Sequence, residues 1–394
     1  MNSFRKVLIN GALFLAMLVC LALATEGTLR AFDFKPLEYV MPEDQRGVST
    51  LYRPHATGTW SGMLGHVKEF QTPISTNAWS YYDRDYTVEK EPGVFRVLCL
   101  GDSYVESWQV PLEKTFHKLL EKKLNERALS EGIPKKIEVI AFGSSGQGSL
   151  MELERLHSLG LSLSPDLVLA FLTPANDFND DWHHVQRLKQ PKPAQPAVQK
   201  PDDRLLKELE LYRKLIVFPQ SRLNRWIAFA MLELYRRAVP GRLAESWKNS
   251  VGQYAKPGSE IFKESESRWN EAFAITIANY ARMNRLCSER GILFAAVIVD
   301  EPLSYDARLM RSVKRTLPDI DKHLDFDQFF NKLLSFLKKG RVLTVNLNSA
   351  FAKYHRQTGD SLHLRYDGHW NENGHDAVAA ILEISVYDAL ARAR

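Results

Sequence analysis

Strongly apolar runs recur along the chain from residue 95 onward, and amphipathic stretches separate them. Each run is apolar over nearly its whole length, which is typical of parallel strands that helices cover on both faces. The stretches between the runs carry a helical period, and a last one, 373–392, closes the chain. This alternation predicts an α/β fold with a five-stranded, doubly wound parallel sheet flanked by helices. The runs are 95–100, 137–142, 167–172, 293–299 and 342–347, and the clearest helical stretches between them are 112–128 and 266–289.

The N-terminus has a different pattern. Arg5 and Lys6 precede a stretch without charged residues, 7–24, which is long enough for a short membrane span and has its positive charge on the cytoplasmic side. We therefore expect residues 1–25 to form a membrane anchor, with the rest of the chain extracytoplasmic. The sequence Ala-Leu-Ala at 22–24 also resembles a processing site, so a cleaved signal peptide and a secreted protein are the alternative.

Two further stretches depart from the strand and helix alternation. Residues 26–93 show no helical period and carry scattered aromatic residues, so we expect an irregular arm of short strands and loops packed on the main domain. The main domain is then 94–394, with an insertion at 186–262. The insertion begins as a proline-rich connector and continues as two basic amphipathic helices. Because it follows the third apolar run directly, we expect a lid over the site; a role at the membrane surface is the alternative.

Composition narrows the function classes. The 394 residues, 45% of them hydrophobic and 25% charged, are enough for one large α/β core and an insertion. The net charge of +5 is spread along the chain among acidic residues, so we expect no nucleic-acid partner. The three cysteines form no CxxC pair and lie in apolar surroundings, which predicts buried small side chains, with no disulfide framework or zinc site. The glycine-rich run 143–149 lacks the spacing of nucleotide-binding loops, so no cofactor is expected.

Residues that could take part in catalysis follow the apolar runs at their carboxyl ends. Ser103 follows the first run, Gly143 the second and Asn176 the third, while Asp367 and His369 precede the last helix. In a doubly wound sheet these positions gather at one edge. Acyl transfer from an ester needs a nucleophile, a base, a group that orients the base, and donors for the oxyanion. A serine at a helix start is more often an N-cap than a nucleophile; the joint occurrence of all these groups favours catalysis.

These motifs, in this order, resemble the SGNH (GDSL-type) hydrolase superfamily over roughly 94–177 and 293–392. The similar segments are Gly-Asp-Ser ending at Ser103, IAFGSSG with Gly143, TPAND with Asn176, and the Asp-Gly-His of 367–369. The resemblance implies a flavodoxin-like sheet and Ser103 as nucleophile. It also implies an oxyanion hole formed by Ser103, Gly143 and Asn176, and a triad completed by Asp367 and His369. The chain looks most like the membrane-anchored, extracytoplasmic branch of that superfamily.

The chain departs from the family pattern in two places. Val105, Glu106 and Ser107 stand where the family usually continues its first motif as xTxG. The last motif is usually DxxH, whereas Asp367 and His369 are separated by one residue, as in the D-x-H-W motif of alginate O-acetyltransferase-like proteins. Since residues i and i+2 of an extended segment point the same way, this spacing leaves a direct hydrogen bond between Asp367 and His369 open.

Three other candidates have simpler structural explanations. We expect His375, inside the start of the last helix, to be structural. The acidic and histidine-rich segment 176–184 has a spacing that suits no common metal geometry, so we expect a solvated loop there and no metal site. Glu106, one turn after Ser103, is expected at the surface.

The sequence thus predicts a serine esterase that removes acyl groups, acetyl above all, from an extracytoplasmic glycan or lipid. Its partners would be that substrate and, through the N-terminal segment, the membrane. An O-acetyltransferase for a cell-surface polysaccharide, using the same Ser103 and His369, is one alternative. A non-enzymatic, membrane-anchored binding scaffold is the other, but a binding module has no need of a positioned nucleophile.

Overall fold

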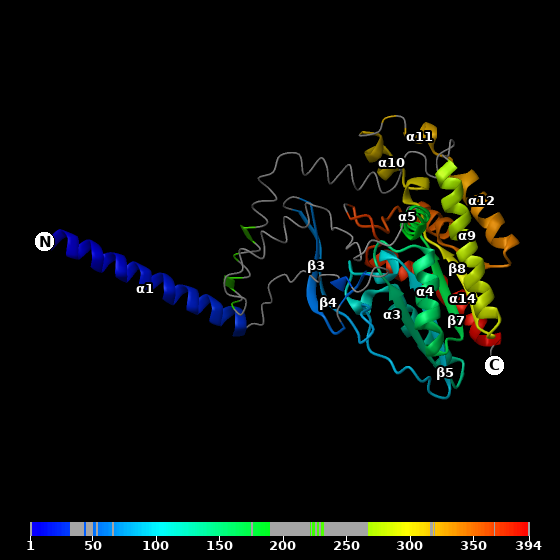
Figure 1. The fold of residues 1–394 in the computed structure, drawn as a ribbon, viewed down its shortest axis with the longest axis horizontal. Helices are drawn as coiled ribbons and strands as arrows, with labels where there is room; N and C mark the ends of the chain where they lie inside the picture. Colours follow the sequence, from blue (N-terminus) through cyan, green and yellow to red (C-terminus); the bar gives the residue numbers. More distant parts are fainter. Residues whose placement is uncertain are drawn as a thin grey trace. The chain divides into compact units, whose positions relative to one another are not determined.

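The structure is a computed structural model (Figure 1). It describes residues 2–31, 43–44, 50–52, 54–64, 67–174, 176–189, 221, 223–224, 227, 230–231, 267–315, 318, 320–365 and 367–392. The chain divides into two units, Met1–Tyr39 with Val198–Arg242, and Val40–Ala197 with Leu243–Arg394. The second unit contains the sheet and all candidate site residues.

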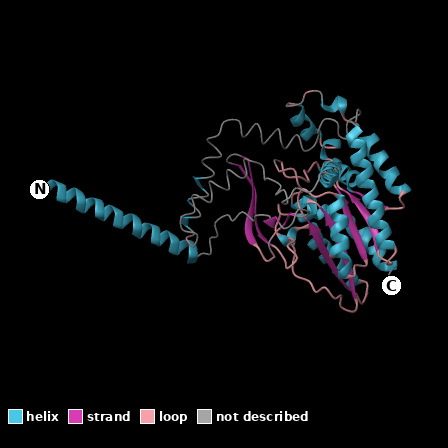
Figure 2. Cartoon of the chain, viewed as in Figure 1, coloured by secondary structure: helices cyan, strands magenta, loops and turns pink. Residues whose placement is uncertain are grey.

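The sheet has five parallel strands in the order β6-β5-β7-β8-β9, which confirms the predicted fold class. The first strand in the sequence lies inside the sheet, between the second and the third. Figure 2 shows the strands with helices packed around them. The strands are β5 (Val94–Gly101), β6 (Lys136–Gly143), β7 (Leu167–Leu172), β8 (Leu293–Ile298) and β9 (Leu343–Asn346).

Helices cover both faces of this sheet, and short 3-10 turns join some of them. The helices are α2 (Ser103–Glu106), α3 (Phe116–Ser130), α4 (Ser149–Ser158), α5 (Asp177–Lys189), α9 (Ser267–Ser288), α10 (Ala307–Lys314), α11 (Ile320–His323), α12 (Phe326–Lys339), α13 (Leu347–Thr358) and α14 (Glu372–Arg392). The 3-10 turns are η1 (Leu112–Lys114), η2 (Gly160–Leu163) and η3 (Pro302–Ser304).

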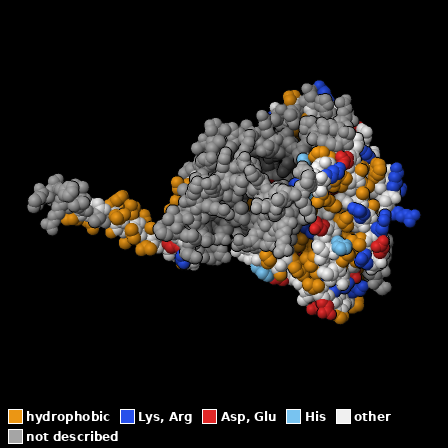
Figure 3. Space-filling view, in the orientation of Figure 1, with side chains coloured by type: hydrophobic (Ala, Val, Ile, Leu, Met, Phe, Trp, Pro, Cys, Tyr) orange, Lys and Arg blue, Asp and Glu red, His pale blue; other side chains and the backbone are white. Residues whose placement is uncertain are grey.

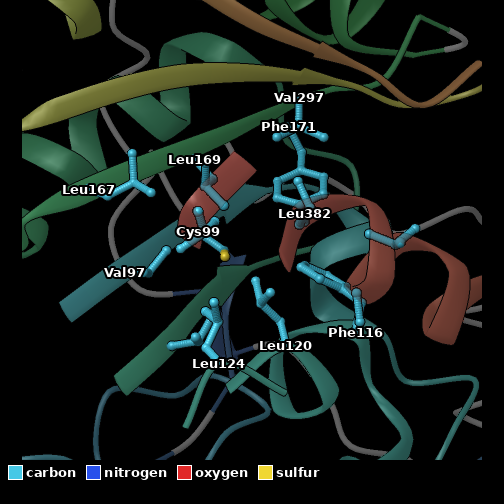
Figure 4. Close-up of a cluster of buried hydrophobic side chains, with 14 of the residues drawn as sticks. Val97, Cys99, Phe116, Leu120, Leu124, Leu167, Leu169, Phe171, Val297 and Leu382 are labelled. Carbon is cyan, nitrogen blue, oxygen red and sulfur yellow. The ribbon is translucent and has the colours of Figure 1, made fainter. Parts of the chain in front are cut away.

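The core forms two layers because successive strand side chains point to opposite faces. Along β5, Leu98 and Leu100 pack in the layer that includes side chains of α4, α5, α9 and α12. Val97 and Cys99, which alternate with them, pack in the layer that includes side chains of α3, α13 and α14. Figure 4 shows part of this second layer. Burial on both faces explains why the strand runs are apolar throughout.

The arm before the sheet contains two antiparallel strands, β3 (Thr57–Leu64) and β4 (Val67–Ser75), and a short pair, β1 (Glu43–Asp44) and β2 (Thr50–Leu51). Its aromatic side chains pack on the rest of the same unit, against side chains of β6 and of the segment after α2. The Tyr81 ring stacks on Phe142 with 4.3 Å between centroids, and the Trp60 ring contacts Trp108 edge-on at 5.3 Å.

The N-terminal unit contains α1 (Asn2–Ala31). Among the described residues, Ile9–Ala31 is the one helix long and apolar enough to cross a membrane, and Figure 3 shows hydrophobic side chains along it. The helix continues past residue 25, so the prediction of an irregular chain was wrong for 26–31. A hydrogen bond of 2.7 Å from Arg30 to Glu26 stabilises this last turn. Cys20 is exposed on α1, which corrects the expectation that all three cysteines are buried.

Most of the predicted insertion, including its proline-rich connector from residue 190 on, lies outside the described residues. Its first residues, 186–189, belong to α5. The described residues near 221 contact the end of α1: Glu26 Oε2 accepts hydrogen bonds from the Ser221 hydroxyl (3.0 Å) and the Leu223 N–H (2.7 Å). The lid and the membrane-surface role both stay predictions.

A buried ion pair ties the sheet to the segments around it. The Arg96 guanidinium on β5, 1% exposed, donates to Glu138 Oε2 on β6 at 3.0 and 2.9 Å. It also donates to the carbonyl oxygens of Leu163 (2.7 Å) and Val88 (3.1 Å). All these partners compensate for removing the guanidinium from water.

Glu138→Ala should therefore lower the free energy of unfolding by about 3 kcal/mol, because it leaves the buried Arg96 charge without its counterion. The measurement is chemical denaturation followed by circular dichroism. Glu126→Ala, which removes an exposed pair with Lys122, is the control and should cost less than about 1 kcal/mol. An equal, small cost for both variants would contradict a stabilising role of the buried pair.

Candidate active site

The turn from β5 into α2 carries Ser103. Asp102 is the N-cap residue of α2, and its carboxylate accepts the Tyr104 N–H at 3.0 Å. Its carbonyl oxygen also accepts the N–H groups of Val105 (3.2 Å) and Glu106 (3.0 Å). Ser103 is thus the first residue of the helix, and its hydroxyl is not used as the cap. Asp102, not Ser103, is therefore the N-cap of α2, and the role of nucleophile remains for Ser103.

The structure brings Ser103, His369 and Asp367 together in one chain of hydrogen bonds. His369 Nε2 lies 2.7 Å from Ser103 Oγ, and His369 Nδ1 lies 2.6 Å from Asp367 Oδ1. A carboxylate only accepts, so Nδ1 carries the proton and Nε2 is left to accept from the serine hydroxyl. This is the arrangement of a Ser-His-Asp triad.

A tight turn at Gly368 lets the Asp367 and His369 side chains contact each other although one residue separates them. Gly368 has φ +87°, in the left-handed region that glycine adopts without strain. Its N–H donates to the Leu364 carbonyl oxygen (3.2 Å), and the Leu364 N–H donates to that of His369 (2.8 Å). The segment is therefore curled, not extended, and the direct hydrogen bond that the sequence left open is formed.

Aromatic side chains fix the imidazole from the side. The Tyr104 ring lies 4.9 Å from the His369 ring and 4.7 Å from the Trp370 ring, centroid to centroid. Trp370 is fully buried, and its Nε1 donates to Asp300 Oδ1 at 2.9 Å. The Tyr305 hydroxyl also donates to Asp300. Asp300 was not among the predicted site residues, although its place directly after the fourth apolar run was a usable signal.

The charge environment of the imidazole favours its protonated form. Burial lowers the pKa of His369, but the Asp367 carboxylate beside it and the negative charges of Asp102 and Glu106 together raise the pKa by more, so the pKa lies above the usual 6.5. The neutral form that can accept a proton is therefore the main form only above this raised pKa.

The two other predicted oxyanion residues lie beside the nucleophile turn. Gly143, at the end of β6, pairs with Gly101 of β5, and a Cβ built on it would lie 2.0 Å from Glu106 N. Only glycine fits there, because the α2 backbone passes so close. Asn176 donates from Nδ2 to Asp102 Oδ2 at 2.9 Å. The amide nitrogen has two hydrogens, so one remains for a ligand.

The segment 176–184 is not the solvated loop that the sequence predicted. It forms the start of α5, and Asp177 and Asp181 are buried. Asp177 accepts the Thr173 N–H at 2.8 Å, and Asp181 accepts from Ser149 Oγ (2.5 Å) and Thr276 Oγ1 (2.5 Å). These carboxyls join α5 to the neighbouring strand end and helices, which a sequence pattern of exposed acidic residues does not reveal.

Glu106 is buried, with 4% of its surface exposed, so the prediction of a surface role was wrong. The residue faces the loop after β6, where the Ser145 hydroxyl donates to it. His375 is also buried, and its Nδ1 accepts the Phe116 N–H at 3.2 Å, a structural contact with α3.

No family model and no curated protein matches the sequence. Solved structures do show similarity in fold. An acetyl xylan esterase, AlAXEase, aligns at 12% identity and TM-score 0.37, over 74% of this chain and 100% of its own. The lipase Lip_vut3 from a goat rumen metagenome aligns at 14% and 0.38, over 74% and 97%. A lipase/acylhydrolase from Enterococcus faecalis aligns at 12% and 0.34, over 74% and 95%. At such low similarity, activity has to be judged from the geometry of the site.

Asp367→Asn should lower kcat by up to about 10⁴-fold, because an amide favours the wrong imidazole tautomer. It should also move the rising limb of the pH–rate profile to lower pH, since the carboxylate that raises the pKa of His369 is lost. The measurement is the pH dependence of ester hydrolysis by both forms. If the variant kept more than about a tenth of the activity, a deficit of about 1.4 kcal/mol, a Ser-His dyad would replace the triad.

Asn176→Ala should lower kcat by about 10² to 10³-fold, the usual cost of one lost oxyanion donor. KM should change little, because the donor acts mainly on the charge that develops in the transition state. Steady-state kinetics on a soluble acetyl ester measures both constants. An unchanged kcat would remove Asn176 from the oxyanion hole.

Proposed function

We propose that this chain is a serine esterase that hydrolyses O-acyl esters through an acyl-enzyme on Ser103. The observation that carries the proposal is the hydrogen-bonded chain of Ser103, His369 and Asp367 at the carboxyl edge of the sheet. The N-cap is supplied by Asp102, so the Ser103 hydroxyl has no structural task in the turn.

In the acylation step, Ser103 Oγ attacks the ester carbonyl carbon while its proton passes to His369 Nε2. The carbonyl oxygen becomes an oxyanion, for which the Ser103 N–H, the Gly143 N–H and the free Asn176 amide hydrogen are the donors. Asp367 stabilises the imidazolium that forms. The intermediate then collapses, the bond to the alcohol oxygen breaks, and His369 gives its proton to that oxygen.

The second half of the reaction repeats these roles with water. His369, neutral again, takes a proton from a water molecule, whose oxygen attacks the acyl carbon on Ser103. The second oxyanion collapses, Ser103 Oγ regains its proton from His369, and the carboxylic acid leaves. No cofactor is needed, because every proton is moved by His369.

The proposed substrate is an acyl ester, acetyl above all, on an extracytoplasmic glycan or lipid. The support is α1, whose apolar stretch follows the basic residues 5 and 6 and is long enough to anchor the chain in a membrane. The anchored topology, the membrane-bound branch of the SGNH superfamily and the D-x-H-W likeness are parts of this proposal.

The deciding variant is Ser103→Ala. Full-length protein in detergent should hydrolyse a soluble acetyl ester, and Ser103→Ala should lower kcat by about 10⁴-fold or more with an unchanged circular dichroism spectrum, since it removes the attacking oxygen. Ser130→Ala, at an exposed serine at the end of α3, is the matched control and should keep the wild-type kcat.

The same assay separates hydrolysis from transfer. With an oligosaccharide added, release of free acetate should stay the main outcome. Acetyl groups transferred to the sugar instead would make the protein an O-acetyltransferase. Comparable turnover by Ser103→Ala would make it another kind of enzyme, and no turnover by the wild type would leave it a non-enzymatic scaffold.

A further inference from the structure

Glu106 is a buried acid that the proposed mechanism does not use. It is the last residue of α2, one helical turn after Ser103, and it is 4% exposed. The Ser145 hydroxyl donates a hydrogen bond to one oxygen of its carboxyl group, Oε2. Its second oxygen, Oε1, is buried and has no hydrogen-bond partner. A buried polar atom without a partner is uncommon in proteins and asks for an explanation.

Glu106 lies close to two of the proposed oxyanion donors, Ser103 on its own helix and Gly143 at the end of β6. Its backbone abuts Gly143, because a Cβ built on that glycine would lie 2.0 Å from Glu106 N and 2.6 Å from Glu106 Cα. Through Ser145 its side chain also holds the loop that continues from Gly143. Glu106 thus lies on the same short helix as the nucleophile; its backbone packs against the strand end that carries a second oxyanion donor, and its carboxyl group contacts the loop that follows.

The groups around Glu106 bring its pKa close to neutral pH, where both charge states are populated. Burial raises the pKa of Glu106 to about 7, although the hydrogen bonds from Ser145 and Tyr52 and the positive charge of Arg155 on α4 each lower it. Glu106 also interacts electrostatically with His369, whose pKa it helps to raise. Arg155 is 5% exposed, and its guanidinium makes no hydrogen bond within the described part of the chain, so it does not lock Glu106 in the charged form.

We propose that Glu106 is a positioning residue whose uncharged carboxyl the esterase needs for turnover. Uncharged, it holds the loop after Gly143 against α2 without placing negative charge beside the oxyanion. Ionised, it opposes the negative charge that develops on the carbonyl oxygen, because like charges repel strongly in a site screened from water. This inference rests on the proposed esterase function.

The expected pH dependence follows from two opposite requirements. His369 must be neutral, so turnover rises with pH through its pKa, while Glu106 must be protonated, so turnover falls as pH rises through the Glu106 pKa. The wild-type profile of kcat/KM should therefore be bell-shaped, with a falling limb that begins near pH 7. His369 and Asp367 alone would give a rise to a plateau.

Glu106→Gln tests this directly, since glutamine keeps the size and an acceptor oxygen for Ser145 but does not ionise. The ratio of kcat/KM at pH 9 to that at pH 7 should be about tenfold or more higher in this variant than in the wild type. Glu113→Gln, at an exposed glutamate of η1, is the control and should keep the wild-type profile. Circular dichroism at both pH values checks that every form remains folded.

Ser145→Ala provides a second, independent readout if Glu106→Gln does not fold. The Ser145 hydrogen bond lowers the pKa of Glu106, so its removal should raise that pKa and move the falling limb to higher pH. An active wild type without a falling limb, or a limb unchanged in both variants, would overturn the role of Glu106 and leave the esterase intact. A wild type that is inactive at every pH would instead overturn the esterase.

Discussion

The buried carboxyl of Asp102 joins the two segments that carry Ser103 and Asn176. Its Oδ1 accepts the Tyr104 N–H and so starts the helix that presents Ser103, while its Oδ2 accepts the Asn176 amide. One side chain thus fixes the turn after β5 relative to the loop after β7. Loss of either hydrogen bond would leave a fully buried carboxyl partly unsatisfied, at a cost of about 1–3 kcal/mol. That penalty keeps both segments in register.

His369 is held by a separate set of contacts, which extend to the end of β8. Trp370 follows His369 directly, and its indole is fixed to Asp300 at the end of β8. Burial raises the pKa of Asp300, but His363 and the hydrogen bonds from Tyr305 and Trp370 together lower this pKa by more. The carboxyl is therefore charged at neutral pH. Ser103 and His369 are thus positioned by different buried acids, on loops that the parallel sheet brings to one edge.

The sheet could be predicted from the sequence because burial on both faces leaves a continuous apolar run for each strand. The site was harder where it depends on conformation or on burial of a polar group. The direct contact of His369 with Asp367 depends on the positive φ of Gly368, which residue spacing does not encode. Glu106 looked like a surface residue because a lone acid after a helix start usually is one; in the folded chain it is buried, with its carboxyl against the loop after β6.

Acids buried near the nucleophile link the chemistry to the stability of the fold. Burial raises the pKa of Asp102 and Asp177, and that of Glu152 on α4. A group with a folded pKa above its unfolded value holds a proton in the folded state that the unfolded chain releases. Its contribution to stability is therefore complete below the unfolded pKa and is lost as pH rises through the folded pKa. Raising the pH thus removes the contribution of these acids to stability while it leaves His369 in the neutral form that accepts a proton, so the fold and the proposed base place opposite demands on pH.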